Sequence, residues 1–76
     1  MNDRRLTLTI YGLAHGGGGS LIVERALVRL PGVLRVSVNP MTEMAYVEYD
    51  AAVTNAARLV AVVEEAGFEV SVHAAR

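Results

Sequence analysis

Hydrophobic and polar residues alternate in four stretches of this chain. In residues 6–11 an apolar side chain follows each polar one, and the same period of two returns in residues 33–38, 43–49 and 68–73. A period of two puts every second side chain on one face, which is typical of a strand with one buried face. The side chains expected on the buried faces are Leu6, Leu8, Ile10, Leu34, Val36, Val38, Ala45, Val47, Tyr49, Phe68, Val70 and Val72.

Two further stretches show the 3.6-residue spacing of amphipathic helices. The first predicted helix covers residues 21–30, with Ser20 placed to cap its start and Pro31 ending it after Leu30. The second is expected to start within residues 50–54 and to end at Gly67, a residue suited to a left-handed cap. The tail, residues 74–76, is expected to be frayed.

The order strand, helix, strand, strand, helix, strand predicts an α+β fold. With right-handed crossovers it gives a ferredoxin-like βαββαβ sandwich, a four-stranded antiparallel sheet with two helices on one face, and residues 1–76 form one domain. In that topology the first and last strands are neighbours. The loop after the first strand should therefore lie close to Phe68, and His73 should lie at the opposite end of the sheet.

Composition and charge make some partners and locations unexpected. The sequence has 53% hydrophobic residues, and its seven basic and eight acidic residues are scattered along the chain. No uninterrupted apolar run of about 20 residues is present, so no membrane insertion is expected, and the start of the chain has a strand pattern instead of a signal peptide. We expect a cytoplasmic location. Nucleic acid is not expected as a partner, because Tyr46 is a lone aromatic in the middle of the predicted exposed sheet face.

The least ordinary stretch is residues 15–20, His-Gly-Gly-Gly-Gly-Ser. Glycines lose more backbone freedom on folding than other residues, so four in succession indicate a place where backbone closely approaches something. Two other interpretations stay open. The stretch is also compatible with a flexible connector, and Gly-Gly-Gly-Gly-Ser is a common engineered linker.

Several short motifs, in order, resemble the heavy-metal-associated domain family of copper chaperones, mercury-binding proteins and metal-pumping ATPases. The resemblance covers residues 8–70. It is carried by Leu8-x-Ile10-x-Gly12, Val23-Glu24-x-Ala26-Leu27-x-x-Leu30-Pro31-Gly32-Val33, Val36-x-Val38-Asn39, Thr42-Glu43-x-Ala45-x-Val47-x-Tyr49-Asp50 and Glu64-x-Ala66-Gly67-Phe68.

The resemblance implies a Cys-x-x-Cys metal site in the loop after Gly12, yet this chain has no cysteine. Two thiolates at that spacing bind a soft ion such as Cu(I). Counting back from Val23 puts glycines at both cysteine positions, whereas counting forward from Gly12 puts His15 at the first and Gly18 at the second. The metal loop that the resemblance implies is thus degenerate.

His15 is the one candidate metal ligand of the loop, and a neutral imidazole suits copper, zinc or nickel. One ligand does not make a site, and Met41, Met44 and His73 are expected to lie away from the tip of the loop. The predicted contacts with a ligand or partner are Leu13, Ala14, Gly16, Gly17, Gly18, Gly19, Ser20 and Phe68. The partners that the resemblance implies are a metal-transporting ATPase or a second copy of the chain.

Three other functions compete with metal binding for this sequence. A phosphate site at the helix start lacks a Gly-Lys-Ser or a spaced glycine fingerprint. A small-ligand or anion-sensing module similar to ACT domains shares the fold class and is the alternative to a metal domain. No nucleophile, base and orienting group come together in the sequence, so we expect no enzyme.

Overall fold

The computed structural model describes residues 2–15 and 17–76, and of His15 the backbone only. Strand β1 (Asp3–Tyr11) leads through a short 3₁₀ helix, η1 (Leu13–His15), into helix α1 (Gly19–Val28). Strands β2 (Val33–Asn39) and β3 (Met44–Asp50), helix α2 (Ala56–Glu65) and strand β4 (Glu69–Ala75) follow. This is the predicted βαββαβ order.

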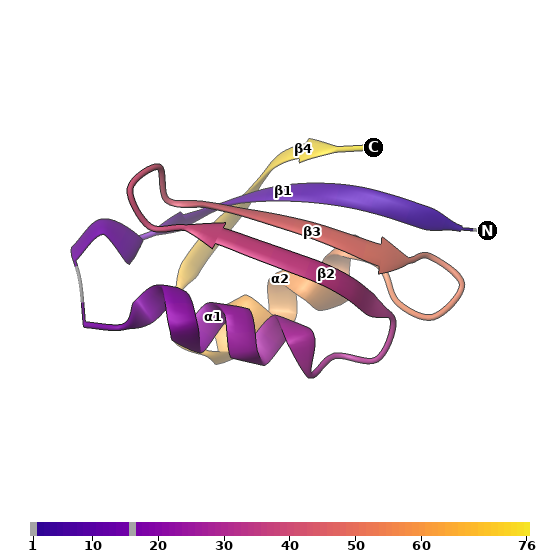
Figure 1. Ribbon diagram of the computed structural model, residues 1–76, viewed down its shortest axis with the longest axis horizontal. Helices are drawn as coiled ribbons and strands as arrows, with labels where there is room; N and C mark the ends of the chain where they lie inside the picture. The colour runs from indigo at the N-terminus through magenta and orange to yellow at the C-terminus, as the bar shows by residue number, and fades with distance from the viewer. Residues whose placement is uncertain (1, 16) are drawn as a thin grey trace.

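The four strands form one antiparallel sheet in the order β2-β3-β1-β4. Both helices lie on the same side of the sheet, and the other side is uncovered (Figure 1). The predicted ferredoxin-like sandwich is therefore confirmed. Within the described residues no helix has the length and apolar character needed to cross a membrane.

The core lies between the sheet and the helices. The alternation in β1 and β3 is confirmed, because Leu8, Ile10 and Ala45 are fully buried and their neighbours along each strand are not. Each helix adds two buried side chains one turn apart, and a two-layer fold needs both stripes to cover its sheet. The helical core residues are Val23, Leu27, Leu59 and Val63.

Two strands depart from strict alternation because each contains a bulge, which turns the side chains around it. In β2 the register shifts between Val33 and Arg35, so Leu34 is the extra residue and its side chain is 56% exposed. The prediction that Leu34 faces the core is wrong for this reason. In β4 the register shifts around His73, and Val72, on this edge strand, also remains half-exposed.

Three predicted boundaries differ from the structure. Helix α1 starts and ends two residues early, because Gly18 already turns the chain into it and Arg29 caps it. Residues 50–54 form a turn around Asp50, whose carboxylate accepts from the Ala52 N–H at 2.8 Å, so α2 begins later. The tail is not frayed, since Arg76 exchanges two backbone hydrogen bonds with Arg5 of β1. The left-handed cap at Gly67 is confirmed by its φ of 98°.

Candidate functional site: the glycine loop

The loop between β1 and α1 starts with a sharp turn at Gly12, whose φ is 94°. Leu13 then points into the core with only 2% of its surface exposed, whereas Ala14 beside it is exposed. The buried side chain of Leu13 therefore attaches the loop to the core. Of the contacts predicted here, Ala14 is accessible from outside and the Leu13 side chain is not.

Gly17 and Gly18 form the outer part of the loop, and both have φ values in the left-handed region, 77° and 75°. Side chains other than glycine are strained there, although a Cβ at either position would meet nothing within 4 Å. Gly18 is the residue that starts α1, and its carbonyl accepts the N–H groups of Leu21 and Ile22 at 3.2 Å each. The prediction that Ser20 caps the helix is wrong, because Ser20 already lies inside its first turn.

Gly19 is where the chain passes close to Phe68. A Cβ at Gly19 would lie 3.2 Å from two carbons of the Phe68 ring and 3.5 Å from Leu13. The predicted proximity of the loop to Phe68 is therefore confirmed. Glycine at this position lets the first turn of α1 approach the ring more closely than a side chain would allow.

Glu43 holds the other side of the loop. Its carboxylate accepts the N–H of Gly12 at 2.8 Å and the N–H of Ala14 at 3.4 Å, and its carbonyl accepts the N–H of Ile10 at 2.8 Å. Glu43 is also the one residue other than glycine with a positive φ, 59°, among those described. Sequence reasoning missed this role because Glu43 is 31 residues away from Gly12; the antiparallel pairing of β1 with β3 is the signal that leads to it.

The predicted metal ligands do not form a cluster in the described part of the chain. Gly16 and the imidazole of His15 lie outside the described residues. Among residues 2–14 and 17–76, no three His, Cys, Asp or Glu side chains come together in a way that could hold a metal ion. The prediction that His73 lies at the opposite end of the sheet is wrong, because β4 continues beyond it to Ala75 and His73 lies beside Thr7 and Leu8, in the middle of β1.

The two methionines need a correction. The β2–β3 turn contacts the loop through Glu43, so Met41 and Met44 belong to the same end of the sheet as the glycines. Met44 is opposite Thr9, whose hydroxyl lies 3.8 Å from its sulfur, and Met41 is 87% exposed. The antiparallel pairing of β3 with β1 brings the start of β3 to the end of β1.

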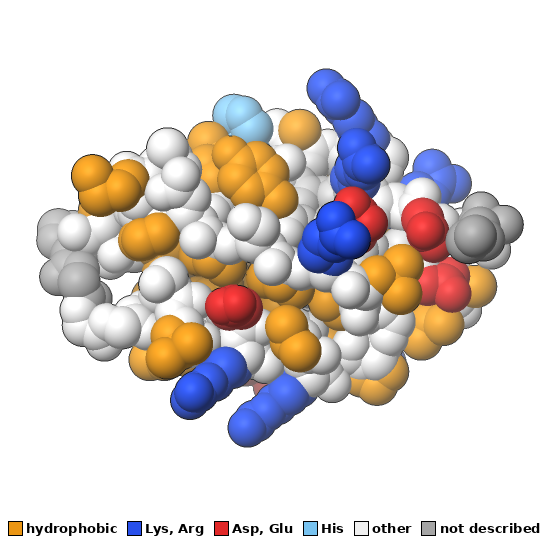
Figure 2. Space-filling view, in the orientation of Figure 1, with side chains coloured by type: hydrophobic (Ala, Val, Ile, Leu, Met, Phe, Trp, Pro, Cys, Tyr) orange, Lys and Arg blue, Asp and Glu red, His pale blue; other side chains and the backbone are white. Residues whose placement is uncertain are grey.

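Exposed apolar side chains surround this end of the molecule. Leu21 and Ile22 are 49% and 50% exposed in the first turn of α1, and Tyr11 is 47% exposed just before the loop. Figure 2 shows hydrophobic side chains at the end of the molecule that carries the loop, on the left of the view. Such a grouping on a small domain is typical of a contact surface for another macromolecule.

The model of the heavy-metal-associated domain family matches residues 18–69. The chain belongs to this family. No curated protein matches it. Several solved structures do, among them a copper binding domain from HMA7, a P-type ATPase, with 27% identity over 96% of this chain and 97% of that one and a TM-score of 0.90.

Two bacterial structures are similar to this heavy-metal-associated domain to the same degree. Oxidized MerP from Ralstonia metallidurans CH34 has 28% identity, covers 95% of this chain and 99% of its own, and has a TM-score of 0.89. A putative copper-ion-binding protein from Bacillus anthracis str. Ames has 29% identity, 93% and 100% coverage and a TM-score of 0.86. These matches favour the metal-domain family over the ACT-like alternative.

The chemistry at this loop differs from the Cys-x-x-Cys site that the resemblance implied. The chain contains no thiolate, and what the loop presents is backbone: two left-handed glycines and the uncapped first turn of a helix with no acidic residue in it. Around that backbone lie apolar side chains.

Proposed function

We propose that this heavy-metal-associated domain is a non-catalytic module of metal-ion trafficking ancestry that acts by docking a partner at its glycine loop, without carrying a thiolate-bound metal. The partner is a metal-transporting ATPase or a second copy of the domain. The observation that carries the proposal is the close approach of Gly19 to Phe68, with Glu43 bonded to the opposite side of the loop.

This packing argues against the interpretation of the loop as a flexible connector. A flexible linker has no reason to meet an aromatic ring at contact distance or to offer two N–H groups to one carboxylate. These contacts hold Gly12, Ala14 and Gly19 in place, and pre-organisation of such positions lowers the entropy cost of docking. The same argument weighs against an inserted linker at this position.

Metal binding through His15 is the competing function, and a titration separates the two. The full chain, labelled with ¹⁵N, is titrated with Cu(I), Zn(II) and Ni(II) while the amide signals of residues 13–20 are followed. We expect no saturable shifts at equimolar metal. As a control, the copper binding domain from HMA7 is titrated in parallel, and its Cu(I) binding shows that the measurement would detect a site. Saturable shifts in the unaltered chain would contradict the proposal.

Docking is tested with two probes, an unlabelled second copy of the chain and the copper binding domain from HMA7. We expect saturable amide shifts in residues 17–22 with one of them. Ile22→Glu places a charge on the exposed first turn of α1 and should abolish the shifts. Val53→Glu adds the same charge at the equally exposed β3–α2 turn and should leave them unchanged. Equal loss in both variants would contradict docking at the loop.

Glu43 offers a more local test. Glu43→Gln keeps one acceptor oxygen but removes the charge that holds the two loop amides, and a charge-assisted hydrogen bond of this kind contributes about 1.5–3 kcal/mol at most. We expect the Gly12 and Ala14 amide signals to shift, and docking of the second copy or the ATPase domain to weaken severalfold. Glu69→Gln, which removes a charge from the exposed start of β4, is the control. Unchanged loop signals in Glu43→Gln would show that the carboxylate does not shape the loop.

A further inference from the structure

The uncovered face of the sheet carries three arginines in one row, on β1, on β2 and just after β4, with a glutamate of β3 between two of them. Arg5 of β1 and Arg35 of β2 both lie opposite Glu48 of β3, and Arg5 exchanges backbone hydrogen bonds with Arg76, which follows β4. Across the sheet the order is thus Arg35, Glu48, Arg5 and Arg76, so two arginines flank the carboxylate and the third lies one strand further away. We call Arg5, Arg35, Glu48 and Arg76 the arginine row.

The carboxylate of Glu48 does not neutralise the three guanidinium groups of the arginine row. The Nε atom of Arg5 is 3.8 Å from Oε1 of Glu48, and the side chains are 76% and 33% exposed. Within the described residues this is the one ion pair closer than 4 Å. An exposed pair at that distance contributes about 0–1 kcal/mol, so it leaves the guanidinium groups free to pair elsewhere. The side chains of the row, three guanidinium groups and one carboxylate, therefore sum to a net charge of about +2.

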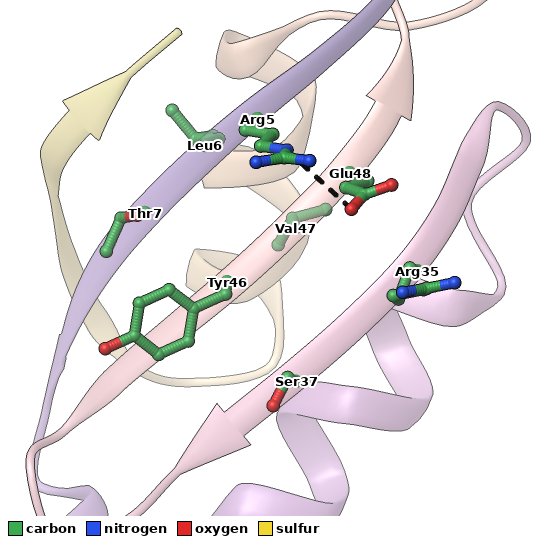
Figure 3. A pocket seen from close by; sticks show the side chains of 8 residues that line it. All are labelled: Arg5, Leu6, Thr7, Arg35, Ser37, Tyr46, Val47 and Glu48. Atoms are coloured by element: carbon green, nitrogen blue, oxygen red, sulfur yellow. Dashed lines mark ion pairs between the residues drawn. The ribbon is translucent and has the colours of Figure 1, made fainter.

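A hollow of about 320 Å³ lies beside the row. Figure 3 shows Arg5, Glu48 and Arg35 toward one end of it and Thr7, Tyr46 and Ser37 toward the other. A second hollow of about 350 Å³ shares Arg5, Thr7 and Tyr46 and continues to Arg76, so the two form one shallow tract across the sheet. Figure 2 shows basic and acidic side chains next to one another toward the upper right of the view.

We propose that this tract docks an extended acidic segment of a protein partner, with carboxylates on the arginine row and an apolar or aromatic side chain against Tyr46. Guanidinium groups bind carboxylates in a fork geometry that matches both oxygens. Arg5 and Arg35 flank β3, which puts their strands about 10 Å apart, and alternate side chains of an extended peptide lie about 7 Å apart. Two acidic residues at positions i and i+2 therefore reach both arginines, given the length of the arginine side chains.

The other occupants fit less well. Single-stranded nucleic acid binds by stacking successive bases on aromatic side chains, and the tract offers one tyrosine ring, Tyr46, and the imidazole of His73. In a second copy of this chain, the acids at positions i and i+2 of a strand are Glu48 and Asp50, which lie in β3 between two paired strands, and Glu64 and Glu65 lie on a helix. The proposal concerns different residues from the glycine loop and stands independently of the proposed function.

The test uses the full ¹⁵N-labelled chain and a synthetic ten-residue peptide with glutamate at alternate positions and one central tyrosine. We expect saturable shifts at Thr7, Ser37 and Tyr46, with residues 13–20 unaffected. Arg5→Gln with Arg35→Gln should weaken binding about tenfold. The control, Arg29→Gln with Arg58→Gln, removes two charges from the helices and should change affinity less than about twofold. Glu48→Gln should tighten binding about threefold, because it removes the competing carboxylate.

Four outcomes overturn the proposal. The first is the absence of saturable shifts with the acidic peptide. The second is equal binding of a matched peptide with glutamine in place of glutamate. The third is tighter binding of a ten-nucleotide oligothymidylate, which would assign the tract to single-stranded nucleic acid. The fourth is the appearance of the same shifts on concentrating the protein alone, which would assign it to a second copy. Loss of loop docking in the separate experiment leaves these results unaffected.

Discussion

The two helices are alike in length and in core contacts but differ at their first turns. Each spans ten residues and buries two side chains one turn apart. Helix α2 starts with Asn55, whose side-chain oxygen accepts the Arg58 N–H at 2.9 Å, whereas α1 starts with a left-handed glycine and no side-chain cap. A side chain therefore caps the first turn of α2, whereas the first turn of α1 has no side-chain cap. Helix stability alone does not account for the missing cap of α1. This helix start lies in the loop where the resemblance implies the metal site.

The largest effects on the free energy of unfolding are expected at the buried positions, where the two helices are alike. Leu27→Ala in α1 and Leu59→Ala in α2 each empty a fully buried position, so each should lower the free energy of unfolding by about 2–5 kcal/mol. Urea unfolding of the full chain measures both. Val28→Ala, at a position 58% exposed, is the control and should cost far less. A cost for Leu27 that is only a small fraction of that for Leu59 would show that α1 is not held by its core.

The next largest effects on stability are expected at the first residues of the helices. Different replacement residues should restore stability at the two positions. Asn55→Ala removes a cap and should cost about 1 kcal/mol, while Asn55→Ser should restore most of it. Gly18→Ala should cost about 1–2 kcal/mol for another reason, the strain of a Cβ at a φ of 75°. Gly18→Asn should restore part of that stability, because asparagine tolerates the left-handed region. If Gly18→Ala proves neutral in urea unfolding, the left-handed start of α1 is wrong.

The smallest effect is expected at Ser20. As an interior residue of the first turn with no cap bond, Ser20→Ala should change the free energy of unfolding by no more than about 0.5 kcal/mol. The cap that the sequence pattern predicts would instead cost about 1 kcal/mol. Chemical denaturation of Ser20→Ala beside Asn55→Ala distinguishes the two.

Strand faces and fold order could be predicted because they depend on local periodicity. Leu8 and Ala45 are buried as the alternation requires, and the position of Phe68 beside the loop follows from the neighbouring first and last strands. Leu34 was not predictable in this way. Its bulge shifts the register by one residue, and no local pattern marks that shift.

The site was less predictable than the fold, since its contacts join distant parts of the chain. The sequence located the loop and its glycines, but the bonds from Glu43 to Gly12 and Ala14 depend on how β3 pairs with β1. The same is true of the arginine row, whose members are scattered from Arg5 to Arg76 in the sequence. Charges that look dispersed along a chain can still gather on one face of a sheet.

The pairing of Arg76 with Arg5 has a practical consequence for handling the protein. Strand β1 begins at the end of the molecule opposite the glycine loop, along a longest dimension of 37 Å, and the chain ends beside Arg5 of that strand, also away from the loop (Figure 1). A tag or surface tether at either end therefore leaves the loop unobstructed and suits immobilised binding measurements there. The same tether at the carboxyl end would stand beside the arginine row, so measurements on that face require an untethered chain.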